Sequence, residues 1–156
     1  MLEIQNVSKS YGKKNALQSC NLVASKHDIV GILGQNGCGK STLFKSIMGL
    51  IEYDTGEISF NGKTCDFDQR KRFGYMPEQR SLFLDLTLYE QLKFLAELKG
   101  LNIEYTNQQI DSLIERFDLK DKKHCVINKL SKGQQQKVQL IAALIHNPDV
   151  LILDEH

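Results

Sequence analysis

The sequence lacks several features that would assign it to a class. No apolar run approaches the roughly 20 residues of a bilayer-spanning helix. The N-terminus has neither the charged start nor the apolar block of a secretory signal. Lysine plus arginine number 20 and aspartate plus glutamate 19, so no charge excess favours nucleic acid or an anionic membrane. The four cysteines share no CxxC spacing, which argues against zinc and fits a reducing compartment.

What remains is typical of one globular domain with alternating strands and helices. The chain has 156 residues, of which 41% are apolar and 25% charged. Residues 2–7 alternate apolar and polar side chains, and 28–33 form a short apolar run that precedes a glycine. We expect strands at 2–7, 16–23, 28–33, 56–62 and 150–153, with an Asn61-Gly62 turn, and a helix over 39–50.

The middle of the chain reads as helical. Capping boxes begin at Thr87, Thr106 and Ser131, and apolar residues follow the first two at helical spacing. We therefore expect residues 81–130 to form a helical insert without strands, and a further helix over 135–146. The pattern predicts an α/β fold with a mostly parallel sheet that this insert interrupts.

Residues 34–41, Gly-Gln-Asn-Gly-Cys-Gly-Lys-Ser, fit the phosphate-binding pattern G-x-x-x-x-G-K-[ST]. They lie between a predicted strand and a predicted helix, as this motif requires. The glycines let backbone N–H groups point inward, and the helix N-terminus adds its positive dipole end. Lys40 would place a charge on the outer phosphates, and Ser41 would supply a hydroxyl for Mg²⁺.

Two further segments carry polar groups at ends of elements. The predicted strand 150–153 is followed by Asp154 and Glu155, at the strand end where ligands bind in open α/β sheets. Asp154 would hold Mg²⁺ through water, and Glu155 would orient or deprotonate an attacking water. Ser131 to Gln134 start a helix with a hydroxyl and a glycine N–H, which indicates either a second phosphate site or an ordinary capping box.

The order GQNGCGKST, LSKGQ, LILDE resembles the ATP-binding cassette (ABC) ATPases, as their Walker A, signature and Walker B motifs. The resemblance extends from Leu2 to Glu155. It implies a P-loop NTPase core of ABC type with N-terminal antiparallel strands. It also implies one domain over 1–156, with its core at 1–80 and 131–156 and a helical subdomain at 81–130. Residues 74–83 are similar to subunits that serve multi-helix membrane exporters.

The resemblance implies ATP and Mg²⁺ as ligands and assigns a role to each matching residue. Lys40 and Glu155 would be catalytic, and the signature would act on the ATP of a second copy in a head-to-tail dimer. The metal-sensing glutamine falls on Glu78 by spacing or on the adjacent Gln79. The expected nucleotide contacts are Tyr11, which would stack on adenine, and Gly34, Gln35, Asn36, Gly37, Cys38, Gly39, Lys40, Ser41 and Thr42. The expected signature residues are Ser131, Lys132, Gly133 and Gln134, and the expected metal ligands are Ser41, Asp154, and Glu78 or Gln79.

The resemblance also implies partners and a location. A separate transmembrane permease subunit and a second ABC subunit are expected, with no nucleic acid, on the cytoplasmic face of the membrane through the permease. The chain stops one residue after Glu155, before the family's switch histidine and the strand that carries it, and His156 stands at the family's proline position. Buried strand edges would then lose pairing, so we expect the chain either to be less stable than a complete domain or to fill the gap by rearrangement or swapping.

Two other functions stay open at this point. The chain is alternatively a truncated nucleotide-binding fragment without turnover, or a soluble ABC ATPase of repair or translation. The near-neutral charge and the single cassette argue against the last class.

Overall fold

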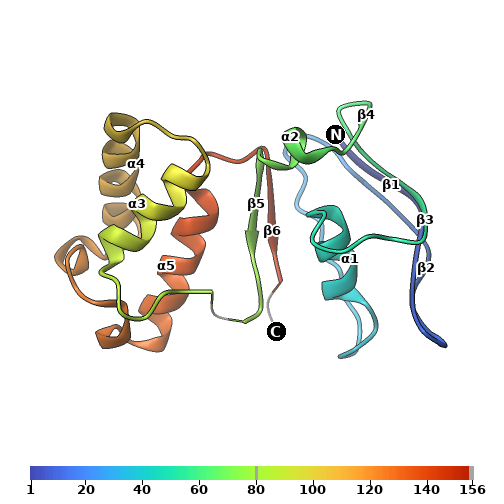
Figure 1. The fold of residues 1–156 in the computed structure, drawn as a ribbon, viewed down its shortest axis with the longest axis horizontal. Helices are drawn as coiled ribbons and strands as arrows, with labels where there is room; N and C mark the ends of the chain where they lie inside the picture. Colours follow the sequence, from blue (N-terminus) through green and yellow to red (C-terminus); the bar gives the residue numbers. More distant parts are fainter. Residues whose placement is uncertain (80, 155–156) are drawn as a thin grey trace. The chain divides into compact units, whose positions relative to one another are not determined.

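A computed structural model of the chain describes residues 1–79 and 81–154 and divides the chain into two compact units, 1–71 and 72–156 (Figure 1). The elements of the first unit are β1 (Leu2–Tyr11), β2 (Lys14–Ala24), α1 (Lys40–Ile47), β3 (Thr55–Phe60), β4 (Lys63–Thr64) and α2 (Phe67–Arg70). Those of the second are β5 (Phe73–Met76), α3 (Leu88–Leu98), α4 (Ile103–Arg116), η1 (Lys120–Lys122), η2 (Ile127–Lys129), α5 (Lys132–Leu144) and β6 (Val150–Leu153).

The first unit contains an antiparallel sheet with the strand order β2-β1-β3-β4. Its register places Leu2 opposite Phe60 and Ile4 opposite Ile58, and all four side chains are buried. The alternation predicted for the first strand therefore provides one apolar face of the sheet. The tight turn between β3 and β4 has positive φ at Asn61 and Gly62, which confirms the predicted Asn-Gly turn.

The predicted strand at 28–33 is wrong for this structure. The segment has no strand assignment, and Ile29 and Leu33 are almost fully exposed. An apolar run shows only that burial would be favourable, whereas a strand also needs a neighbour whose backbone pairs with it. Among residues 1–79 and 81–154, no strand pairs with this segment.

The second unit contains the one parallel pair of strands in the described part of the chain. β5 pairs with β6 in the register Phe73–Val150 to Met76–Leu153, which confirms the buried strand at the end of the chain. β5 itself was not predicted. Helix α5 passes so close to this pair that a Cβ at Gly74 would overlap the Ala143 carbonyl oxygen. A glycine is therefore required where the helix backbone meets the strand.

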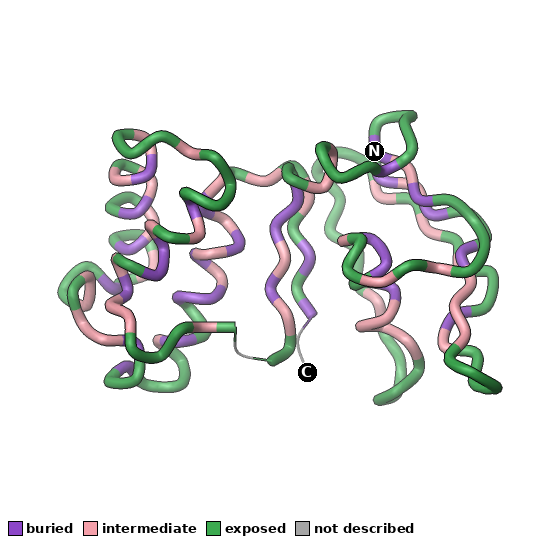
Figure 2. Tube along the Cα trace, in the orientation of Figure 1, coloured by how far each residue is buried: buried purple, intermediate pink, exposed green. Residues whose placement is uncertain are grey.

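Helices α3, α4 and α5 share one apolar core, so the core includes α5, which lies outside the insert predicted over 81–130. Figure 2 marks buried stretches on all three in purple. The fully buried side chains include Leu88, Leu92, Ile110, Ile114, Leu119, Ile127, Val138 and Ile141. Burying such side chains stabilises by roughly 1.5–3 kcal/mol each, which makes this core the main support of the unit.

Two of the three predicted capping boxes are confirmed, at Thr87 and at Ser131. The third is wrong, because α4 begins earlier than the Thr106 box predicts. Asn102 caps it by accepting a hydrogen bond from the Tyr105 backbone N–H at 2.8 Å, and Thr106 is buried inside the helix. Asparagine is as good an N-cap as threonine, so the local pattern alone did not choose between them.

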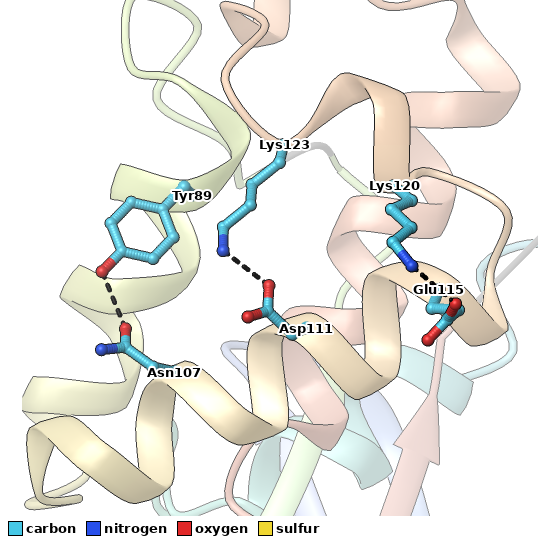
Figure 3. Close-up of polar contacts among 6 residues, drawn as sticks. All are labelled: Tyr89, Asn107, Asp111, Glu115, Lys120 and Lys123. Carbon is cyan, nitrogen blue, oxygen red and sulfur yellow. Dashed lines mark hydrogen bonds and ion pairs between the residues drawn. The ribbon is translucent and has the colours of Figure 1, made fainter.

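Polar contacts join α3, and the residue that follows η1, to α4 (Figure 3). The Tyr89 hydroxyl donates to Asn107 Oδ1 at 2.8 Å, and Lys123 Nζ donates to Asp111 Oδ1 at 2.6 Å. Exposed ion pairs of this kind stabilise by only about 0–1 kcal/mol, so they orient the helices more than they hold them together.

No helix in the described residues is both long enough and apolar enough to cross a membrane. The division into a core and a helical subdomain at residues 81 and 130 remains a prediction.

A half-buried histidine that follows α5 contacts the start of β5. His146 Nε2 lies 3.1 Å from the Phe73 carbonyl oxygen, which also accepts from Lys99 Nζ at 3.3 Å. Burial, and next the charge of Lys99, lower the pKa of His146 below its ordinary value, while the hydrogen bond to Phe73 opposes them. The buried Nδ1 atom has no partner among the described residues, so the neutral form is favoured.

This geometry predicts a stability that falls at acid pH. A folded pKa below the unfolded value of about 6.5 means that the unfolded chain binds a proton more readily below that pH. The free energy of unfolding, measured by urea titration, should therefore decrease between pH 7.5 and pH 5. In His146→Gln, which keeps a donor for Phe73 without titrating, the decrease should be smaller. Parallel decreases in the two proteins would contradict the role of His146.

Candidate nucleotide-binding site

The glycine-rich loop leads directly into α1 in the first unit. Lys40 is the first residue of this helix, and its Nζ donates to the carbonyl oxygens of Gly34 at 2.7 Å and Gln35 at 3.0 Å. The ammonium group is thus folded back over the loop. The first turn of α1 contains no acidic residue, so no carboxylate competes there for a bound anion.

Gly39 makes the closest backbone approach in this loop. Its φ is 105°, and a Cβ on it would overlap the Ala16 carbonyl oxygen of β2. No other residue fits this conformation and this space together. The loop is therefore positioned against the sheet by its own backbone, and the residues from Gly34 to Cys38 are exposed.

Tyr11 ends β1 with a ring that is 52% exposed. The ammonium group of Lys9 lies 5.6 Å from the ring centroid and also pairs with Asp54 Oδ1 at 2.9 Å. An exposed aromatic ring of this kind can stack on a nucleobase. A ring buried against the sheet would have no free face for stacking.

Asp154 follows β6 in the second unit and is only 4% exposed. Tyr75, on β5, donates its hydroxyl to Asp154 Oδ2 at 3.2 Å, and the Asp154 N–H donates to the Met76 carbonyl oxygen at 2.9 Å. Burial, followed by the charge of Asp154, raises the pKa of Tyr75 to about 12, which keeps the phenol a donor. The sequence did not point to Tyr75, because its role depends on the pairing of β5 with β6.

The structure does not decide which of two adjacent residues is the expected metal-sensing residue. Glu78 and Gln79 are both exposed in the segment after β5, so their exposure does not choose between them as the metal-sensing residue. Glu155, the expected base, lies outside the described residues.

The signature residues begin α5. Ser131 Oγ accepts from the Gln134 N–H at 3.2 Å, and Gln134 Oε1 accepts from the Ser131 N–H at 2.9 Å. This is a complete capping box. Ser131, Lys132 and Gly133 are all exposed, and a Cβ at Gly133 would meet open space. The start of α5 is therefore capped by its own side chains and is also accessible from outside the unit.

The expected site residues fall on both units, each of which is internally ordered. The first unit holds Tyr11 and the loop from Gly34 to Thr42, and the second holds Asp154, the Glu78–Gln79 segment and the signature. Each unit contains an oxygen group of the kind that Mg²⁺ prefers, the Ser41 hydroxyl in the first and the Asp154 carboxylate in the second. Within the described ranges no group of three or more His, Cys, Asp or Glu could hold a metal alone.

Known proteins match nearly the whole chain. The family described as ABC transporter matches residues 17–156. The chain is similar to the uncharacterized ABC transporter ATP-binding protein YhaQ of Bacillus subtilis, with 37% identity over 99% of this chain and 52% of that protein. A solved ATP-binding subunit of an ABC transporter superposes with a TM-score of 0.88 at 34% identity, covering 99% of this chain and 66% of that one.

A second solved structure adds a bound state. It is a dimeric ATP-binding cassette in a post-hydrolysis state with ADP and Pi, with a TM-score of 0.84 at 27% identity over 98% of this chain and 73% of that one. The chain spans about half the length of the curated relatives it matches. The P-loop NTPase fold of ABC type expected from the motifs is thus confirmed, and the chain belongs to the ABC transporter family.

Proposed function

We propose that this chain is an ATP-binding subunit that binds and hydrolyses MgATP to drive transport by a separate membrane permease. The observation that carries the proposal is the loop from Gly34 to Lys40. Its backbone is held against β2 at Gly39, and its lysine lies over the loop at the start of α1.

Binding would exchange weak contacts of Lys40 for strong ones. Its ammonium group now donates to two neutral carbonyl oxygens, and ATP would offer it charged phosphate oxygens. Charge-assisted hydrogen bonds are about twice as strong as neutral ones, so this exchange favours the nucleotide. Loop N–H groups would bind the remaining oxygens, and Tyr11 would stack on adenine.

Hydrolysis needs an attacking water and stabilisation of the phosphoryl charge. Ser41 and Asp154 would hold Mg²⁺, which neutralises charge on the phosphates, and Tyr75 would orient the Asp154 carboxylate. Water would attack the γ-phosphorus in line with the bond to the β,γ-bridging oxygen. That bond breaks, ADP leaves, and Glu155 takes the proton of the attacking water.

A second copy would complete the site. The exposed Ser131, Lys132 and Gly133 surround the N-terminus of α5, which is thirteen residues long, and they would face the nucleotide of the partner copy. A solved relative is a dimer bound to ADP and Pi, which supports the pairing of two copies around nucleotide.

The permease would contact an apolar part of the helical unit and so place the chain on the cytoplasmic face of the membrane. Phe83, Leu84 and Phe94 are each more than 40% exposed, and the rings of Phe83 and Phe94 meet edge to face at 5.7 Å. Exposed apolar groups gathered in this way are typical of a protein interface.

Steady-state phosphate release with MgATP tests the proposal. Lys40→Ala and Glu155→Gln should each lower the rate at least about a hundredfold, because one loses phosphate charge and the other the base. Lys45→Ala, on the exposed side of the same helix, should change it less than about twofold. Equal rates in all four proteins would contradict the proposal. Nucleotide binding without turnover in the wild type would instead favour a binding fragment.

Alkylation of Cys38 reports the same site without needing turnover. This thiol is exposed in the phosphate loop, whereas Cys125 is half-buried in the helical unit. MgATP should slow modification of Cys38 at least about fivefold by covering the loop, and should leave the rate at Cys125 unchanged. Mass spectrometry after timed labelling measures both rates at once, and equal slowing or none at Cys38 would count against nucleotide binding there.

A further inference from the structure

Helix α5 carries two polar side chains on its buried side, in line with the exposed Ser131 that caps it. Ser131, Gln135 and Gln139 are spaced by four residues, so they lie one above another along the helix. Gln135 and Gln139 are only 6% and 4% exposed. Burying an amide is costly unless it is hydrogen-bonded, so the partners of these two residues indicate what they do.

Gln135 holds the turn that leads into the signature. Its Nε2 donates to the carbonyl oxygens of Ile127 at 3.0 Å and Leu130 at 3.1 Å. Leu130 directly precedes Ser131, so the first turn of α5 and the segment before it move as one piece.

Gln139 holds the segment after β5 in the same way. Its Nε2 donates to the carbonyl oxygens of Pro77 at 3.3 Å and Gln79 at 3.2 Å. Both N–H groups of the amide are thus used on one short segment, the one that contains the candidate metal-sensing residues Glu78 and Gln79. The Gln139 side chain thus connects this segment to α5.

We propose that Gln139 is a positioning residue that couples the segment 77–79 to the signature at the start of α5. The inference rests on the proposed function, since it assumes that nucleotide acts at Glu78 or Gln79. A displacement of the segment must either break two part-buried hydrogen bonds or move Gln139 and, with it, the helix. Because α5 is continuous from Lys132 to Leu144, its movement reaches Gly133.

Two variants separate the hydrogen bonds from the volume of the side chain. Gln139→Met keeps the length and removes both donors, and Gln139→Glu also places carboxylate oxygens against two carbonyl oxygens. Gln136→Glu is the matched control, because Gln136 is exposed on the same helix. All three are compared with the wild type by amide hydrogen exchange, with and without MgATP, at a concentration where light scattering shows monomers.

Without nucleotide, both Gln139 variants should exchange the amides of 78–79 at least about fivefold faster than the wild type and the control. With MgATP, the wild type should show changed exchange at 131–136 as well as at 34–42. In the Gln139 variants the change at 131–136 should be lost and the change at 34–42 kept, which also shows that they are folded. Wild-type exchange at 78–79 and 131–136 in both variants would overturn the coupling. No change at 34–42 in the wild type would instead contradict the proposed function.

Discussion

The contact between Gly39 and the Ala16 carbonyl oxygen is the constraint on which the candidate site depends. It places the backbone of the phosphate loop directly on β2, with no side chain between them. From there α1 starts in a fixed direction, and Lys40 reaches back over Gly34 and Gln35. A loop held by side chains alone would lose conformational freedom on binding phosphate, whereas this one is already arranged for it.

Helix α5 organises the second unit in a comparable way. Its apolar side completes the core with α3 and α4, and its backbone meets β5 at Gly74. Its buried glutamines reach the segments on either side, so the signature, strand β5 and the segment after β5 share one support. Burying polar side chains in an apolar core lowers the free energy of unfolding unless they are hydrogen-bonded. The hydrogen bonds of Gln135 and Gln139 offset this cost.

The sequence predicted best what is local. The phosphate loop, the capping boxes at Thr87 and Ser131 and the strand at 150–153 each depend on residues within a few positions, and the structure has all of these elements. It failed where the outcome depends on distant partners. Among residues 1–79 and 81–154 no strand pairs with the run 28–33. Strand β5 is recognisable only through β6, and Tyr75 reaches Asp154 only because these two strands pair.

Calorimetric titration of MgATP into the chain tests the central claim, that a backbone-positioned loop binds the phosphates. The account predicts saturable binding to the wild type, a loss of at least about tenfold in affinity in Gly39→Ala, and no loss in Gly31→Ala, where an added Cβ meets nothing within 4 Å. Equal affinities in the three proteins, each shown to be folded by circular dichroism, would contradict it.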